Sequence, residues 1–142
     1  MLKNIPKILS PELLKVLCEM GQGDEIVIGD ANFPSCTIAK DKILVRADGL
    51  GACELLDAIL SLIPLDQYDS CNFMLMETTN GDPTPTIWAD YERIMKKHEP
   101  GAEFSYISRM DYYERAKKSY AVIATGEEQI YANIILKKGV IK

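Results

Sequence analysis

Histidine is almost absent from this chain, which has only His98 among its 142 residues. Histidine is the side chain most often used for proton transfer near neutral pH, and it is the commonest metal ligand. The four cysteines stand singly, about eighteen residues apart, with no CxxC pair and no neighbouring histidine. The sequence therefore predicts neither a zinc site nor a thioredoxin-like redox pair, and we expect the protein to use no metal and no other cofactor.

Long apolar runs and an excess of basic residues are also missing. No run of about 18 uncharged apolar residues occurs, and the first residues, MLKNIPKILSPELL, lack the continuous apolar core of a signal peptide. Acidic residues outnumber basic ones by 21 to 16, and the resulting net charge of -5 disfavours a surface for nucleic acid. We therefore expect a cytoplasmic protein that binds neither nucleic acid nor membranes.

Nothing in the sequence divides the chain into parts. It contains no Pro/Ser-rich linker, no internal repeat and no low-complexity run, and 47% of its residues are hydrophobic. The segment GLGACELL lacks both GxGxxG and GxxxxGK[ST], so no nucleotide site is indicated. We expect residues 1–142 to form a single compact domain with one sizeable core.

Segments with helical and strand patterns alternate along most of the chain. Ser10 and Pro11 suit the start of the first helix, and Gly21 suits its end. Apolar spacing predicts helices over residues 11–20, 51–64, 86–97 and 109–118, and strands over 25–29, 43–49, 71–78, 104–108, 120–125 and 131–137. This alternation predicts an α/β fold with a mainly parallel sheet and helices packed on it.

The most informative stretch is MGQGDEIVIGDANFP, residues 20–34. It is typical of a helix end, a strand buried on both faces, and a tight polar loop. Gln22 and Asp30 stand at opposite ends of this strand. Polar residues at both ends of a buried strand indicate that it borders a site.

Several segments, taken in order, carry a resemblance to a known family. They are GQGDEIVIGDANFP near the start, ILVRADGLG at residues 43–51, and SRMDYYERAKK, VIATGE and YANIILKKGV towards the end. Together they resemble the D-ribose pyranase and L-fucose mutarotase family, and its fucose branch more closely. The resemblance covers almost the whole chain. It implies a subunit of a ring-shaped homo-oligomer, with pentameric rings that often form a decamer and sites near subunit boundaries.

The resemblance implies an enzyme that interconverts the α and β anomers of L-fucose or a related monosaccharide. Mutarotation removes the proton of the anomeric hydroxyl while the ring oxygen gains one, so that the ring opens and can close on either face. The reaction also proceeds in water, and a catalyst need supply only two positioned proton-transfer groups.

Most site positions of the family match this chain. By resemblance, Asp30 holds sugar hydroxyls and can act as a base at the anomeric oxygen, and Arg109 contacts the substrate. Tyr131 offers a ring to the CH face of the sugar and a hydroxyl that can pass a proton, while Ala132 and Asn133 contribute backbone and amide groups. From the residues alone, Asp30 equally suits an Asx turn and Arg109 a helix start.

One position departs from the family. Where the family has a histidine that donates a proton in ring opening, this chain has Gln22, whose amide cannot exchange a proton near neutral pH. We therefore expect either a mutarotase impaired by Gln22 or a homologue that binds monosaccharides without catalysis. Exchange between pyranose and furanose forms, as in the ribose branch, is the third alternative.

Overall fold

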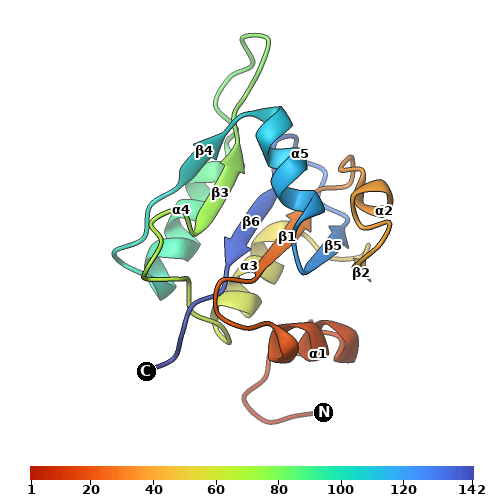
Figure 1. The fold of residues 1–142 in the computed structure, drawn as a ribbon, viewed down its shortest axis with the longest axis vertical. Coiled ribbons are helices and arrows are strands. Elements are labelled where there is room, and N and C mark those ends of the chain that lie inside the picture. Colours follow the sequence, from red (N-terminus) through yellow and green to blue (C-terminus); the bar gives the residue numbers. More distant parts are fainter.

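Six strands and five helices make up the fold of the computed structural model, which describes residues 1–142 (Figure 1). The strands are β1 (Glu25–Gly29), β2 (Ile43–Ala47), β3 (Phe73–Met76), β4 (Ser105–Ile107), β5 (Ala121–Thr125) and β6 (Ile134–Lys137). The helices are α1 (Pro11–Glu19), α2 (Ser35–Ile38), α3 (Ala52–Leu60), α4 (Ile87–His98) and α5 (Arg109–Lys117). None of these helices is long and apolar enough to span a membrane.

The strands form one sheet in the order β2-β5-β1-β6-β3-β4. Strand β6 is antiparallel to both of its neighbours, β1 and β3, and the other strand pairs are parallel. The single α/β domain with a mainly parallel sheet is thus confirmed. Because β6 is reversed, the residues that precede it meet the residues that follow β1 and β3 at one edge of the sheet.

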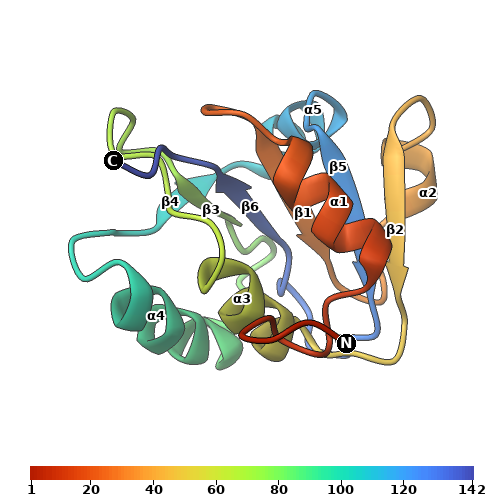
Figure 2. The ribbon, with the colours of Figure 1, turned by 90° about the horizontal axis from the view of Figure 1, so that it is seen from below.

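Helices cover both faces of the sheet (Figure 2). Helices α1, α3 and α4 pack on one face and contribute to a core cluster of 27 buried residues, while α2 and α5 cover the other face with a cluster of 10. In β1, Ile26 and Ile28 belong to the first cluster and Val27 to the second. This alternation is why three consecutive residues of the strand, Ile26 to Ile28, are apolar.

The start of α1 forms as the sequence predicts. The Ser10 hydroxyl oxygen accepts a hydrogen bond from the Leu13 N–H at 3.1 Å, and Pro11 occupies the first helical position. Pro11 fits there because its missing N–H would have no partner in the first turn.

The structure differs from the sequence predictions in three places. The short helix α2 was not predicted, the helix predicted over residues 51–64 ends at Leu60, and the strand predicted over residues 131–137 begins only at Ile134. Tyr131 has a φ of 55°, in the left-handed region that interrupts a strand. Residues 131–133 therefore form a bent segment at the edge of the sheet.

Candidate functional site

A cleft of about 300 Å³ opens at the edge of the sheet where β1, β3 and β4 end and β6 begins. In open α/β sheets, ligands bind outside the carboxyl ends of the strands. The loop that follows β3 projects beyond this edge at the top of Figure 1. Four predicted site residues line the cleft, namely Asp30, Arg109, Tyr131 and Asn133.

Asp30 follows β1 directly and is 5% exposed. One carboxylate oxygen accepts the Asn32 N–H at 2.9 Å, the other accepts the Ala132 N–H at 3.4 Å, and no ion pair involves this residue. Burial raises the pKa of Asp30 above its usual value, although these backbone bonds oppose the shift. The site therefore contains a buried carboxyl group that holds its proton more readily than an exposed one.

Asn133 lies 103 positions from Asp30 in the chain and directly against it in space. The Asp30 N–H donates to the Asn133 side-chain oxygen at 2.7 Å, and this bond orients the amide. No bond within the chain uses the Asn133 amide nitrogen, so this nitrogen remains available as a donor towards the cleft.

The Tyr131 side chain is held by hydrogen bonds to its hydroxyl group. The hydroxyl donates to the Asp82 carboxylate at 2.7 Å, accepts the Thr79 N–H at 3.1 Å and lies 3.1 Å from the Thr79 hydroxyl. The Tyr131 carbonyl also accepts the Trp88 indole N–H at 2.8 Å. These bonds tie the segment before β6 to α4 and to the loop after β3.

Ala132 contributes only its backbone and is fully buried. Its N–H points to Asp30, and its carbonyl accepts the Tyr91 hydroxyl at 2.7 Å. A left-handed backbone at a residue with a bulky side chain, such as Tyr131, costs about 1 to 3 kcal/mol. The surrounding bonds offset this cost, so the segment is fixed before a ligand arrives.

Arg109 supplies positive charge to a cleft that also holds carboxylates. It starts α5, where the Ser108 side chain caps the helix, and its guanidinium lies 5.6 Å from the centre of the Tyr113 ring. Phe33 packs beside Tyr113 with ring centroids 5.9 Å apart, and Met76 completes an apolar wall. Hydrogen-bonding groups opposite aromatic rings suit the polar hydroxyls and the apolar CH face of a sugar.

Gln22 does not line this cleft in the single chain. It is exposed in the turn between α1 and β1, at the far end of β1 from Asp30. Five residues of strand span about 17 Å. The opposite placement of Gln22 and Asp30 is confirmed, but the two side chains do not form one site within a subunit.

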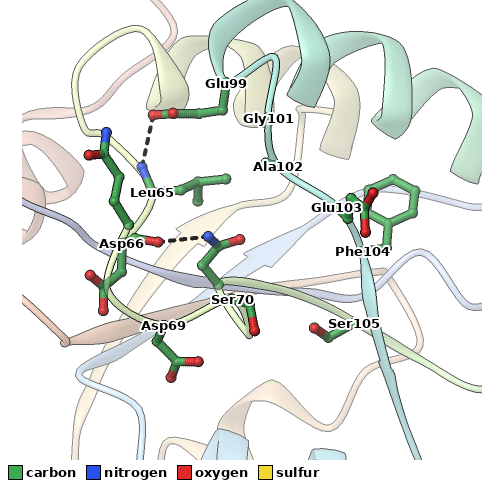
Figure 3. A pocket seen from close by; sticks show the side chains of 12 residues that line it. Leu65, Asp66, Asp69, Ser70, Glu99, Gly101, Ala102, Glu103, Phe104 and Ser105 are labelled. Atoms are coloured by element: carbon green, nitrogen blue, oxygen red, sulfur yellow. Dashed lines mark hydrogen bonds between the residues drawn. The ribbon is translucent and has the colours of Figure 1, made fainter.

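A larger hollow, of about 570 Å³, lies at the opposite edge of the sheet. Asp66 and Asp69 line it from the segment before β3, and Glu99 and Glu103 line it from the connection between α4 and β4 (Figure 3). None of the predicted site residues borders it, and no group of acidic, cysteine or histidine residues in the chain is arranged to hold a metal ion. The smaller cleft is the candidate site because it combines hydrogen-bond donors, acceptors and aromatic rings.

Several residues of the cleft were not predicted from the sequence. Thr79 and Asp82 belong to TTNGDPTP, which is typical of an ordinary loop, and Phe33 and Met76 are typical of core residues. The sequence could have indicated these residues only by their position, because each of them follows or ends a predicted strand at the edge where ligands bind. The Tyr131 and Asp82 pair joins positions 49 apart, which no local pattern predicts.

The fold and this cleft define an α/β protein with a binding site for a small polar molecule such as a sugar. The chain belongs to the RbsD / FucU transport protein family, which it matches over residues 3–141. The family resemblance drawn from the sequence is thereby confirmed.

Three relatives show how far the similarity extends. The chain is 46% identical to the human (Homo sapiens) fucose mutarotase over 146 residues, which cover 99% of this chain and 94% of that protein. A crystal structure of the fucose mutarotase in complex with L-fucose from Streptococcus pneumoniae has 51% identity and a TM-score of 0.93, and covers 99% of this chain and 100% of the other. The FucU structure from Bifidobacterium longum has 50% identity, a TM-score of 0.95 and the same coverage.

Proposed function

We propose that this protein binds L-fucose or a closely related monosaccharide and interconverts its α and β anomers. The observation that carries the proposal is that Asp30, Arg109, Tyr131 and Asn133 line one cleft, although more than 100 positions separate the first from the last. The names of the relatives support the choice of sugar, since fucose mutarotases align over almost the whole chain and one of them holds L-fucose.

The cleft offers a complementary group to each part of a pyranose. The Asn133 amide and the Arg109 guanidinium donate hydrogen bonds to sugar oxygens, and the Asp30 carboxylate accepts from sugar hydroxyls. The rings of Phe33 and Tyr113 face apolar CH groups. Each hydrogen bond to a charged group contributes about 1.5 to 3 kcal/mol, so a few of them give measurable affinity.

Ring opening requires one group that gives a proton and one that accepts it. Asp30 and Tyr131 are titratable groups of the cleft whose side chains are fixed by backbone and loop bonds. General acid or base assistance contributes about 10² to 10⁴-fold to a rate. Because both groups are held in place, the sugar meets them without further ordering of the protein.

We also propose that subunits assemble into a ring, with pentameric rings forming a decamer as the resemblance implies. Gln22 lies at the edge of the sheet opposite the cleft, so it reaches a bound sugar only in the cleft of another copy. In such an assembly Gln22 would hydrogen-bond the sugar without exchanging a proton. A cytoplasmic location is proposed on the same grounds as before and stays a prediction.

A non-catalytic monosaccharide-binding role is the second candidate, and Gln22 is the observation that favours it. Polarimetry separates the two: crystalline α-L-fucose is dissolved with and without the protein, and the optical rotation is followed. We expect relaxation to accelerate in proportion to protein concentration. Relaxation at the buffer rate, with sugar binding intact in calorimetry, would instead support the binding role.

A further inference from the structure

The position of the Tyr131 hydroxyl hydrogen follows from its partners. The Thr79 N–H can only donate, and it points at the tyrosine oxygen from 3.1 Å. The Asp82 carboxylate can only accept, and it lies 2.7 Å away. The tyrosine proton therefore points to Asp82, and the tyrosine oxygen is left as an acceptor.

The Thr79 hydroxyl lies 3.1 Å from the same oxygen and can rotate away, whereas the amide N–H is fixed by the backbone. A sugar hydroxyl entering the cleft can take the place of the threonine hydroxyl. Thr79, Asp82 and Tyr131 all line the cleft, so this exchange happens where the sugar would bind.

We infer that Asp82 makes Tyr131 a proton acceptor: as the anomeric hydroxyl gives its proton to the tyrosine oxygen, the tyrosine passes its own proton to Asp82. This inference deepens the proposed function and rests on it. Asp82 acts through Tyr131 and is a positioning residue, while Tyr131 touches the sugar. A carboxylate beside a tyrosine hydroxyl favours this direction, because a tyrosinate next to it would be repelled.

In the ring-opening step, the O–H bond at the anomeric oxygen breaks and a C=O bond forms there. The bond from that carbon to the ring oxygen breaks, and its electron pair moves to the ring oxygen. Asp30, in its protonated form, gives a proton to the ring oxygen. On reclosure Asp30 recovers that proton, and Asp82 returns its own through Tyr131, so no proton is gained or lost.

The two carboxyl groups suit opposite roles because their surroundings differ. Asp30 is buried and forms no ion pair, and burial raises its pKa, so a larger fraction carries a proton than at an exposed aspartate. Asp82 is exposed at the rim of the cleft. The other charged or titratable groups nearby are Arg109 and Tyr113 from α5, and Glu127, whose charge adds to the rise at Asp30. This assignment reverses the direction expected for Asp30 from the sequence.

The test compares Asp82→Asn with Glu77→Gln, which removes a charge from the same loop at a side chain that makes no hydrogen bond and lies outside the cleft. Anomer exchange of L-fucose is measured by NMR across pH, and affinity by calorimetry. We expect Asp82→Asn to slow exchange about 10²-fold with affinity nearly unchanged, and Glu77→Gln to leave exchange as it is. The pH profile of exchange in Asp82→Asn should differ from that of the unaltered protein, because the variant has no carboxylate to receive the tyrosine proton.

A second comparison covers the case in which Asp82→Asn disturbs the loop. If the two residues act as one relay, Asp82→Asn combined with Tyr131→Phe is no slower than Tyr131→Phe alone. Three results would each overturn the inference: full additivity of the two substitutions, a pH profile in Asp82→Asn equal to that of the unaltered protein, or normal exchange in Tyr131→Phe. If the unaltered protein exchanges no faster than buffer, the proposed function fails and the inference fails with it, whereas failure of the variants alone leaves the proposed function standing.

Discussion

At the scale of single residues, the site depends on a buried carboxyl group whose neighbours are mostly backbone amides. Asp30 accepts the N–H groups of Asn32 and Ala132 and orients Asn133 through its own N–H. The same residue thus shapes the loop and lines the cleft. A substitution that removes the charge of Asp30 but keeps the shape of its side chain separates its role in the loop from its role in binding.

Asp30→Asn should weaken L-fucose binding, because the Asp30 carboxyl group can hydrogen-bond sugar oxygens in both its ionised and its protonated form, and an amide is a weaker partner. The expected loss is about 1.5 to 3 kcal/mol, or roughly 10 to 100-fold in Kd. Titration calorimetry measures it, with the exposed Glu128→Gln variant as control for a change of net charge. Equal affinities for Asp30→Asn and the unaltered protein would remove Asp30 from the site.

Gln22→His should raise the rate of anomer exchange, because the new side chain can exchange protons near neutral pH. An NMR exchange measurement compares it with Gln67→His, which places a histidine at another exposed glutamine outside the cleft. An unchanged rate in Gln22→His, with sugar binding intact, would mean that Gln22 does not face the reacting atoms in any assembly.

At the scale of elements, close backbone contacts fix the loops around the sheet edge. Gly126 follows β5, and a side-chain carbon placed there would lie 2.0 Å from the Asp48 carbonyl oxygen. Gly126→Ala should therefore lower the free energy of unfolding by about 1 to 3 kcal/mol, since backbone must move. Urea unfolding measures the change. Gly49→Ala, where nothing lies within 4 Å, should be nearly neutral, and equal stabilities of the two variants would contradict the account.

The contact between α3 and α4 predicts a pH dependence. The Asp57 carboxylate accepts from His98 at 2.7 Å and from Lys97 at 3.0 Å, and these bonds lower the pKa of Asp57. The folded state then binds fewer protons at Asp57 than the unfolded state. The resulting stability is present above about pH 4 and is lost as the pH falls through the lowered pKa.

Asp57→Asn should consequently unfold at a lower temperature at pH 7, by an amount equivalent to less than about 1 kcal/mol because the pair is partly exposed. The difference in unfolding temperature between Asp57→Asn and the unaltered protein should disappear below about pH 4. Thermal unfolding across this range measures it. A difference that persists at low pH would show that shape, rather than charge, is what Asp57 contributes.

The sequence predicts elements well where one pattern decides them. Strand β1 forms over the predicted residues because every side chain from Ile26 to Ile28 is buried, and α1 follows its cap. The strand predicted from Tyr131 onwards was wrong at its start for the opposite reason. The residues there favour a strand, but hydrogen bonds of Tyr131 with Trp88 and Asp82 hold the segment bent. Such tertiary bonds cannot be seen in a local pattern.

The residues of the candidate site were likewise predicted only in part. Asp30, Arg109 and Asn133 are predicted through the family motifs, and the structure brings them together. Asp82 and Thr79 are not predicted, since their role exists only through a tyrosine distant in sequence. Physical reasoning from sequence locates the edge of the sheet, but not which loop residues complete the site.

At the scale of the whole molecule, the reversed strand β6 explains why one edge of the sheet carries the site. It brings the bent segment before β6 beside the ends of β1 and β3. Gln22 lies at the other edge because it precedes β1, whereas Asp30 follows it, and we therefore expect the site to be completed by a neighbouring copy.

Sedimentation analysis tests that assembly. We expect particles of about five or ten times the 15.9 kDa chain mass, and a loss of exchange activity per chain on dilution below the assembly threshold. A 15.9 kDa particle with undiminished exchange would contradict the proposed ring.

We propose that the cleft both binds L-fucose and catalyses exchange of its anomers. Saturation-transfer NMR tests it most directly: one anomeric proton of L-fucose is saturated, and the loss of signal at the other is measured with and without the protein. We expect transfer well above the buffer level with the unaltered protein, and less transfer with Asp30→Asn. Broadened sugar lines with transfer at the buffer level would contradict it, and would identify a protein that binds the sugar without interconverting its anomers.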